Sequence, residues 1–395
     1  MILALAAALA LDVAPIQAAL AEAKLDAWLL YDFHGQNPIA VELVAPEHLQ
    51  TRRWFLLIPS QGEPIALVHK IEAENFAKVP GRKLRYATWQ ELRAGLAELL
   101  RGRRCVAMEV SPEAAIPYLS RVDAGTLELV RAVAPGVGVV SSADLVQRFK
   151  SRWSDEGKRA HLAAASDLRA LVDDAWRWLS AELRAGRRPT EYDAQQRIWR
   201  GYAERGLESD YPPIVAIGPN AANPHYEPTK EKTDAIREGD LLLVDAWAKR
   251  PGGIYADITL MAWAGKVVPE AHARRFAIVT QARDAAVAFV RERKRAGQPV
   301  RGYEIDDVAR GVVARAGFGE KFIHRTGHSI DARVHGDGVN IDNYETRDTR
   351  LVIPGVGFSI EPGIYLPGEA GYRSEIDVWC GERDCEITTG EPQRA

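Results

Sequence analysis

The apolar positions of residues 12 to about 140 predict helices and strands in alternation. Helices are predicted at Pro15–Lys24, Gln90–Leu100 and Glu113–Ser120, and strands at Ala27–Tyr31, Trp54–Pro59, Ile65–Val68 and Cys105–Val110. Alternation of this kind favours a mixed or parallel sheet covered by helices. No acidic or histidine cluster with catalytic spacing occurs in this part of the chain. The sequence therefore predicts a folded α/β domain over residues 1–150 and little more.

The second part of the chain, residues 151–395, begins with a long helical pattern. Ser154 is placed to cap this helix, and Gly186-Arg-Arg-Pro-Thr interrupts it. Thr190 is placed to cap a second helix, which is predicted to end at Gly206.

The same pair of helices recurs further along the chain. Six residues of the first pair match six of the second at one constant offset: Arg184, Ala185, Gly186, Tyr192, Ala203 and Gly206 match Arg295, Ala296, Gly297, Tyr303, Ala314 and Gly317. A common offset through two helices and their breaks favours an internal duplication. We expect two α-α-β halves in a pseudo-twofold relation, with a site between them that draws residues from both.

Each half is predicted to contain a hairpin with a pair of acidic residues. Glu361 and Glu375 lie equally far either side of Gly368, between the apolar runs Phe358–Leu366 and Tyr372–Trp379. If the hairpin closes at Gly368, the two carboxylates face each other. Like charges directly opposite on paired strands destabilise a sheet, so this arrangement needs a reason.

The upstream hairpin repeats the pattern. Asp245 and Asp257 are symmetric about Pro251, between the predicted strands Leu241–Trp247 and Ile254–Trp263. Four carboxylates match two divalent ions in charge, and oxygen ligands suit hard or borderline metals. Two acidic hairpins therefore suggest a cation site.

Histidines add nitrogen ligands to this picture. His324, His328 and His335 fall within a short segment, and His225 lies in the turn-rich segment Asn223-Pro-His-Tyr-Glu-Pro. A single loop or strand histidine is more often a solvated or capping residue, and each acid taken alone is more often structural. Imidazole is nevertheless the usual nitrogen ligand of Mn, Co and Zn. One histidine added to the four carboxylates gives a five-ligand dinuclear set.

Composition excludes several classes of partner. The chain has 395 residues, with 51 Lys and Arg against 54 Asp and Glu and a net charge of −3, so no basic excess is available for a phosphate backbone. No nucleic-acid partner is expected. The apolar segment Met1–Leu11 lacks a basic leader, is followed by Asp12, and is too short to span a bilayer. We expect it to pack against the protein rather than act as an export signal, and no membrane association is expected.

The three cysteines, Cys105, Cys380 and Cys385, are too few for a disulfide framework, which suits a reducing cytosol. Cys380 and Cys385 could meet across a turn, but we expect them to be reduced strand residues. The sequence predicts a cytoplasmic protein.

Five motifs in order resemble those of the M24 metallopeptidases of the pita-bread fold, in the branch of the Xaa-Pro dipeptidases (prolidases) and Xaa-Pro aminopeptidases. The motifs are Pro224-His225-Tyr226, Val244-Asp245-Ala246, Ala256-Asp257-Ile258-Thr259, Thr326-Gly327-His328-Ser329, and Ile360-Glu361-Pro362-Gly363 with Arg373-Ser374-Glu375. The resemblance covers about residues 155–385. The segment 1–150 resembles the creatinase-type accessory domain only in size and in the order of strands and helices.

The resemblance implies two divalent ions per chain, with Mn²⁺ or Co²⁺ expected for activity and Zn²⁺ as the alternative. Asp257 and Glu375 would bridge both ions, Asp245 would chelate one, and His328 and Glu361 would complete the other. A hydroxide between the metals would attack the carbonyl of an Xaa-Pro bond, with Glu361 transferring the proton.

The resemblance also implies substrate residues. His225 and His335 would contact the substrate and the tetrahedral intermediate. Apart from the resemblance, Arg373, which shares a predicted strand face with Glu375, and Arg333 are the candidates for binding the substrate carboxylate. A small Xaa-Pro peptide is the expected substrate, and a homodimer the expected assembly.

Three departures from the family pattern bear on the shape of the pocket. Asp245 and Asp257 are twelve positions apart where eleven is usual, which predicts an extra turn residue at Arg250–Gly253. Asp331 stands where glycine is common, and Arg333-Val-His335 replaces Asp-Val-His.

The compact chain favours a dipeptidase, with an aminopeptidase acting on longer Xaa-Pro peptides as the alternative. A metal-free relative such as creatinase and a non-catalytic peptide- or histone-binding protein are disfavoured, because every expected ligand is present.

Overall fold

The computed structural model describes residues 11–394. The chain divides after Lys150 into two compact units, residues 1–150 and 151–395, and each is described by itself. Residues 1–10 of the apolar segment Met1–Leu11 lie outside the described residues, so its predicted packing stays a prediction. Among residues 11–394, no helix combines the length and apolar character needed to cross a membrane.

The first unit contains a mixed six-stranded sheet. Its strands are β1 (Ala27–Asp32), β2 (Trp54–Pro59), β3 (Ile65–His69), β4 (Arg82–Tyr86), β5 (Cys105–Met108) and β6 (Gly138–Ser141), in the order β4-β3-β2-β1-β5-β6. The pairs β1–β2 and β2–β3 are antiparallel, and the others are parallel. This confirms the predicted mixed sheet.

Helices cover both faces of this sheet because the strand side chains alternate between two cores. The helices are α1 (Val13–Glu22), α2 (Pro38–Val44), α3 (Trp89–Leu100), α4 (Ala124–Val133) and α5 (Ala143–Lys150), with the short 3₁₀ helices η1 (Ala73–Phe76), η2 (Pro112–Ala114) and η3 (Pro117–Leu119). From β1, Trp28 and Leu30 join the core under α1, α2 and α5. Leu29 and Tyr31 join the opposite core under α3 and α4.

The predicted helix Glu113–Ser120 is wrong, because the chain forms the separate turns η2 and η3 there. Glu113 and Ala114 have φ values of +56° and +53°, outside the helical region. Pro117 has no N–H to donate to an α-helix and clashes with the preceding turn.

The second unit contains two pairs of helices. They are α6 (Asp155–Arg184) with α7 (Glu191–Glu204), and α8 (Glu270–Arg295) with α9 (Gly302–Arg315). The ends of α6 and α8, and both bounds of α7 and α9, keep the constant offset of the repeat in the sequence. Gly186 and Gly297 leave the first helix of each pair with φ of +73° and +65°, a conformation that favours glycine. The predicted duplication is therefore present in the helices.

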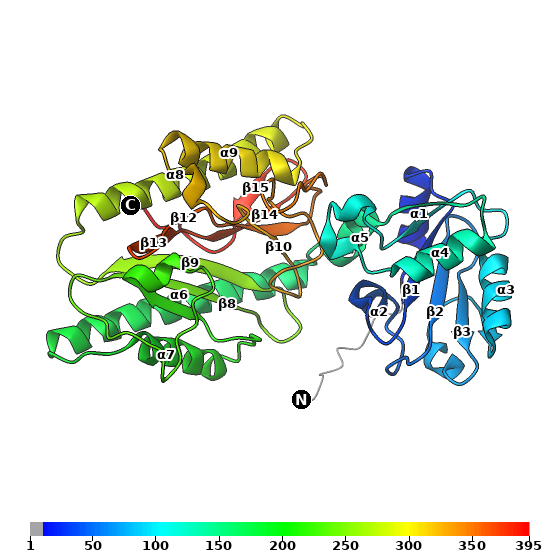
Figure 1. Cartoon of the computed structure of the whole chain (residues 1–395), viewed down its shortest axis with the longest axis horizontal. Helices are drawn as coiled ribbons and strands as arrows, with labels where there is room; N and C mark the ends of the chain where they lie inside the picture. The colour runs from blue at the N-terminus through cyan, green and yellow to red at the C-terminus, as the bar shows by residue number, and fades with distance from the viewer. Residues whose placement is uncertain (1–10, 395) are drawn as a thin grey trace. The chain divides into compact units, whose positions relative to one another are not determined.

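Each helix pair packs against its own strands, as Figure 1 shows. Strands β7 (Ile214–Ile217), β8 (Leu241–Ala248) and β9 (Ala256–Trp263) form one sheet, with η4 (Gly218–Ala222) after β7. A second sheet contains β10 (Ser329–Ile330), β11 (Gly357–Ile360), β14 (Ile376–Cys380) and β15 (Cys385–Ile387). Separately, β12 (Gly363–Leu366) pairs with β13 (Ala370–Arg373). The 3₁₀ helix η5 (Gly319–Lys321) follows α9. Leu168 and Val172 of α6 share a core with β8 and β9. Val279 and Ala286 of α8 share another with β11 and β14.

The glutamate hairpin closes at Gly368, as predicted. Gly363 pairs with Arg373 and Ile360 pairs with Ile376, and both pairs are centred on Gly368. The predicted strands are not continuous, however, because each divides in two. Pro362 cannot donate to a ladder, so pairing stops there and Glu361 and Glu375 lie in the gap between the two ladders.

The aspartate hairpin differs from its prediction. Asp245 pairs with Thr259, and Asp257 pairs with Trp247, so the two aspartates are diagonal neighbours on one face rather than directly opposite. The centre is Gly252, with φ of +70°, one residue beyond Pro251. A turn centred one residue later moves the pairing by two residues, which keeps both carboxylates on the same face.

The prediction for Cys380 and Cys385 is wrong, because they form a disulfide. The antiparallel register of β14 and β15 places these two residues directly opposite each other. Their Cα atoms are 4.0 Å apart. Cys105 is a half-buried free thiol.

Candidate metal centre

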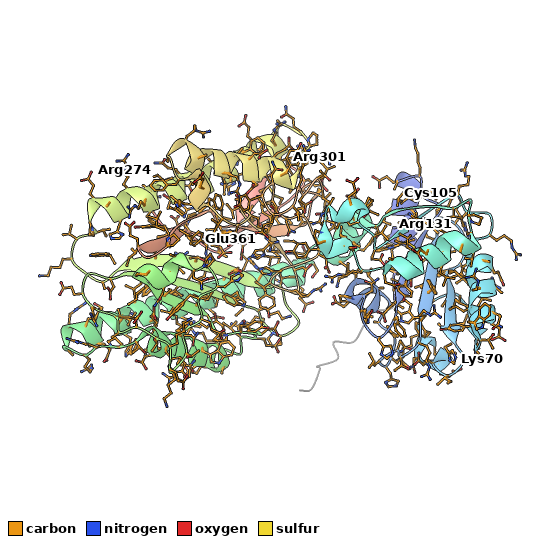
Figure 2. All side chains as sticks on the ribbon, viewed as in Figure 1. Lys70, Cys105, Arg131, Arg274, Arg301 and Glu361 are labelled. Carbon is orange, nitrogen blue, oxygen red and sulfur yellow. A yellow bond between two sulfur atoms is a disulfide. The ribbon has the colours of Figure 1, made fainter. Side chains whose placement is uncertain are left out.

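The five predicted metal ligands come from both halves of the second unit. Asp245 and Asp257 lie on β8 and β9, His328 precedes β10, and Glu361 and Glu375 occupy the gaps between the paired strands. Asp257, His328 and Glu375 are each 3–4% exposed, and Asp245 is 9% exposed. Figure 2 shows Glu361 in the interior of this unit, between the two helix pairs.

Three carboxylates surround the imidazole of His328. Its Nε2 lies 3.4 Å from Glu361 Oε1, 3.7 Å from Asp257 Oδ2 and 4.0 Å from Glu375 Oε1. One donor atom from each of Asp257, His328 and Glu375 lies within 4.8 Å of the other two, a spacing that suits a cation. The structure thus brings four of the five predicted ligands together, and their role as ligands stays a prediction.

The fifth predicted ligand, Asp245, joins this cluster through Arg373 and Thr259. The Arg373 guanidinium forms an ion pair with Asp245, and its Nε donates to Thr259 Oγ1 at 2.9 Å. Thr259 Oγ1 in turn donates to Glu375 Oε2 at 2.7 Å. Arg373 therefore binds Asp245 directly and is linked to Glu375 through Thr259.

The electrostatics of the cluster favour a bound cation. Burial and the neighbouring carboxylates raise the pKa values of Asp257 and Glu375 well above their usual range. Burial raises the pKa of Glu361 to about 7 and lowers the pKa of His328 well below its ordinary value. Asp257 Oδ1 is buried and has no hydrogen-bond partner among the described residues. A carboxylate oxygen left in this state, beside three other acids and an imidazole, fits a divalent cation.

Removing metal should make the stability of the protein fall as pH rises through about 7, the raised pKa of Glu361. In the metal-free fold the raised pKa values of Asp257, Glu361 and Glu375 stabilise the folded chain at low pH, and this contribution is lost as pH rises. Buried histidines such as His328, whose pKa is lowered in the folded chain, oppose this loss only while the unfolded chain still binds protons, up to about one pH unit above the ordinary imidazole pKa of about 6.5. The unfolding temperature in chelator should fall with pH, by about 1.4 kcal/mol of free energy per linked proton and pH unit.

The measurement compares thermal unfolding in chelator and in excess Mn²⁺ at pH values on both sides of about 7. The gap between the two curves should widen as pH rises. If the unfolding temperatures in chelator and in Mn²⁺ keep a constant difference across the pH range, the carboxylates of the cluster do not repel one another when metal is removed.

His335 lies against the cluster on an organised loop. Its ring meets the ring of His328 edge-on, with centroids 4.3 Å apart. Asp331 ties this loop together, because its carboxylate accepts hydrogen bonds from the backbone N–H groups of Arg333 and Asp337, both at 2.9 Å. The departure from glycine at residue 331 therefore has a structural role. Arg333 forms an ion pair with Asp337.

His225 is exposed on the loop that follows η4. A fully buried carboxylate from α7, Glu191, holds this loop by accepting hydrogen bonds from Tyr226 Oη at 2.6 Å, Ile217 N at 2.8 Å and Asp234 N at 2.9 Å. The adjacent Tyr226 thus anchors His225 to the second helix of the first pair.

Several residues of the site had no predicted role. Thr259 shares a strand face with Asp257, so side-chain alternation could have indicated it. Alternation does place Asp377 on the face of Glu375, but without a role. His324 belongs to the predicted histidine cluster and bonds to Tyr365 Oη at 2.8 Å, and Tyr365 lies 3.4 Å from Arg373 Nη1. No local signal in the sequence points to His161, which reaches the site from α6.

Known proteins resemble this chain over half of its length or more. The probable dipeptidase PepE of Mycobacterium tuberculosis is 28% identical over 324 residues, which cover 81% of this chain and 79% of the relative. The Xaa-Pro dipeptidase of Lactobacillus helveticus is 32% identical over 200 residues, 50% of this chain and 47% of that protein.

Solved structures share the fold. The dipeptidase PepE of Mycobacterium ulcerans matches with a TM-score of 0.69 and 23% identity, covering 97% of this chain and 95% of that one. The prolidase of Thermococcus sibiricus matches with a TM-score of 0.64 and 23% identity, covering 97% and 96%. The predicted pita-bread architecture is confirmed.

The family described as "Metallopeptidase family M24" matches residues 163–382, more than half of the chain. This stretch contains all five predicted ligands, and its two helix pairs carry the duplication found in the sequence. The chain therefore belongs to metallopeptidase family M24 and is a metallopeptidase, as its motifs predicted.

Proposed function

We propose that the protein hydrolyses the Xaa-Pro bond of small peptides, with Xaa-Pro dipeptides as the main substrate and two divalent ions per chain. The observation that carries the proposal is the buried cluster of carboxylates around His328, contributed by both halves of an M24 fold. The names of relatives support the substrate, because the proteins of Lactobacillus helveticus and Lactobacillus delbrueckii that match this chain are called Xaa-Pro dipeptidases.

Asp257 and Glu375 would bridge the two ions, Asp245 would bind one, and His328 and Glu361 would bind the other. Such ions, when bound, lower the pKa of a water molecule and polarise a carbonyl. Mn²⁺ or Co²⁺ is proposed, since the donor set is four carboxylates and one imidazole, with Zn²⁺ as the alternative.

Glu361 is proposed to move the proton. Its side chain is 13% exposed, so it borders the cluster and remains within reach of a substrate. The prolyl leaving group needs a proton on its nitrogen, and a carboxyl that first accepts a proton from water can deliver it there. Ser359 Oγ donates to Glu361 Oε1 at 3.3 Å and helps to fix its orientation.

His335 and His225 are proposed to contact the substrate. The His335 ring meets the His328 ring edge-on, and both His335 and His225 are exposed residues. The prolyl bond lacks an amide hydrogen, so recognition must use the shape of the ring together with the charged ends of the peptide.

Arg373 and Arg333 are the proposed partners of the substrate carboxylate. Arg373 is buried and already bonded to Asp245 and Thr259, which suits a residue that orients the site. Arg333 belongs to the loop of His335, where a substrate carboxylate would compete with Asp337 for its guanidinium. Arg333 is therefore the better placed of the two for binding a dipeptide.

An aminopeptidase acting on longer peptides is the second candidate. The Mycoplasma pneumoniae protein called putative Xaa-Pro aminopeptidase is 31% identical to this chain over 171 residues. The homodimer and the cytoplasmic location stay predictions.

Substrate length separates the two activities. Initial rates should be measured on Xaa-Pro, Xaa-Pro-NH₂ and Xaa-Pro-Yaa-Zaa, with and without chelator. A dipeptidase should prefer the free carboxylate by about 10- to 100-fold in kcat/KM, the worth of a charge-assisted hydrogen bond, and chelator should abolish turnover. Equal rates on all three would establish an aminopeptidase, and rates unaffected by chelator would refute the metal-dependent reaction.

A further inference from the structure

Asp377 is a fully buried acidic residue that contacts the backbone of one predicted metal ligand, Asp257. It lies on β14 two residues beyond Glu375 and is 0% exposed. Its Oδ2 accepts the backbone N–H of Asp257 at 2.8 Å. The Asp377 side chain, rather than a main-chain carbonyl, therefore accepts this hydrogen bond. It joins β9, which carries Asp257, to β14, which begins directly after Glu375.

The Asp377 carboxyl group is poorly satisfied for a buried polar group. Its Oδ1 has no hydrogen-bond partner among the described residues. A buried carboxylate with so few donors costs folding free energy, and an apolar residue would avoid that cost. Stability alone therefore does not explain an aspartate at this position.

His161 lies close to Asp377. It is fully buried on α6, with its Nε2 3.8 Å from Asp377 Oδ2. Its Nδ1 lies 2.6 Å from the carbonyl oxygen of Tyr255, which can only accept, so Nδ1 carries the proton. Its Nε2 then accepts from Thr388 Oγ1 at 2.7 Å. His161 is therefore fixed in one orientation on both sides.

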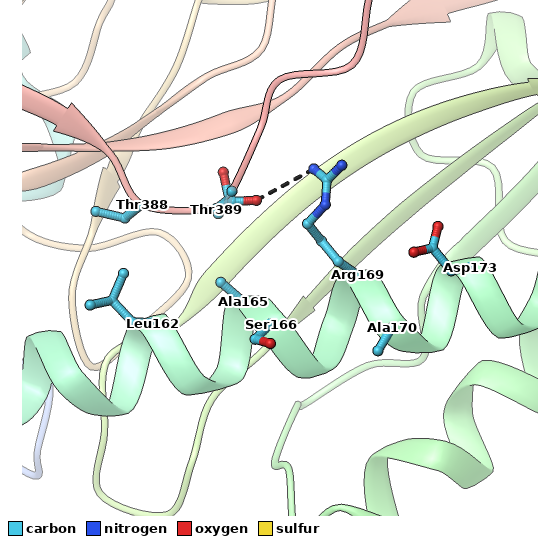
Figure 3. Close-up of a pocket in the computed structure, with 9 residues that line it drawn as sticks. Leu162, Ala165, Ser166, Arg169, Ala170, Asp173, Thr388 and Thr389 are labelled. Atoms are coloured by element: carbon cyan, nitrogen blue, oxygen red, sulfur yellow. Dashed lines mark hydrogen bonds between the residues drawn. The ribbon is translucent and has the colours of Figure 1, made fainter.

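The segment Thr388–Thr389 forms hydrogen bonds with the backbone of Asp377. The Asp377 backbone N–H donates to Thr389 Oγ1 at 3.0 Å, and Thr388 N donates to the Asp377 carbonyl at 2.9 Å. Figure 3 shows this segment passing over α6, where it lines a surface pocket of about 360 Å³ and Arg169 donates to the Thr389 carbonyl at 3.4 Å. None of the predicted site residues lines this pocket, and the hydrogen bonds of Thr388 and Thr389 connect the segment to His161 and Asp377.

We propose that Asp377 is a positioning residue for Asp257, and that the segment Thr388–Thr389, which is itself bonded to His161, holds Asp377 in place. By fixing the Asp257 backbone, it aims that carboxylate at His328 and Glu375. This inference rests on the proposed two-metal function. Residues that orient metal ligands typically contribute about 10- to 100-fold in metal affinity.

The experiment measures Mn²⁺ affinity by calorimetry on metal-stripped protein. Asp377→Ala removes the acceptor of the Asp257 N–H and should weaken Mn²⁺ binding about 10- to 100-fold. Asp377→Asn keeps an acceptor oxygen of the same shape and should stay within about threefold of the wild type. Glu386→Ala, an exposed change on the neighbouring strand β15, should bind as the wild type does and serves as the matched control.

The outcomes are distinguishable. If the asparagine variant loses affinity as much as the alanine variant, the charge and not the hydrogen bond matters, and the positioning role is refuted. An alanine variant that binds as tightly as the wild type refutes it too. Should Asp377→Ala fail to fold, Asp377→Asn alone decides. A wild type that binds no Mn²⁺ refutes instead the proposed function on which the inference rests.

Discussion

Replacing Glu375 by glutamine should remove activity and prevent two metal ions from binding together. Glu375 is 3% exposed, its Oε1 lies 4.0 Å from His328 Nε2, and its Oε2 is fixed by Thr259. A neutral amide cannot balance two dications, and each ion supplies several kcal/mol of transition-state stabilisation. We expect kcat/KM to fall by about 10³-fold or more, and metal analysis to show at most one ion per chain. Asp257→Asn should behave in the same way.

The matched control is Glu369→Gln, an exposed glutamate at the turn of the same hairpin. It forms an ion pair with Arg275, which lies on α8 and outside the cluster. This variant should retain both metal loading and turnover. A Glu375→Gln protein that still binds two ions and cleaves Xaa-Pro would remove the basis of the dinuclear site.

Much of the helical architecture could be predicted because its signals are local. Ser154 Oγ accepts from Gly157 N at 3.0 Å, and Thr190 forms a capping box with Asp193, as the residue types at these positions indicate. The constant offset of the repeat predicted the breaks and ends that the two helix pairs share. Capping and periodicity depend on neighbours close in the sequence, so a single sequence carries them.

Strand register could be predicted only in part. The turn at Gly368 fixes the glutamate hairpin, and its register followed from the sequence. The aspartate hairpin turns at Gly252 instead of Pro251, and this choice depends on the conformation of residues 249–255 rather than on symmetry. The Cys380–Cys385 disulfide depends on register in the same way. The number of cysteines favours reduced residues, whereas the register of β14 and β15 places these two directly opposite each other.

The residues that support the site were the least predictable. Thr259 could have been inferred from alternation with Asp257, but Glu191 and His161 come from helices and reach the strands only through tertiary packing. Polar residues on the buried side of a helix have no distinct periodic signal, because they replace apolar residues in the same pattern. Their roles became visible only from hydrogen bonds between side chains that lie far apart in the sequence.

The last prediction separates Glu361 from a simple ligand. Glu361→Gln should lower kcat by about 10²- to 10⁴-fold even at saturating Mn²⁺, because the amide cannot take or return a proton. The side chain lies 3.4 Å from His328 and is partly exposed, so it contacts both the cluster and the solvent side. The measurement is kcat for Xaa-Pro as Mn²⁺ is increased, alongside calorimetric binding of Mn²⁺. Weakened binding with kcat restored at high Mn²⁺ would make Glu361 only a ligand; a kcat that stays low after both ions have bound assigns it proton transfer.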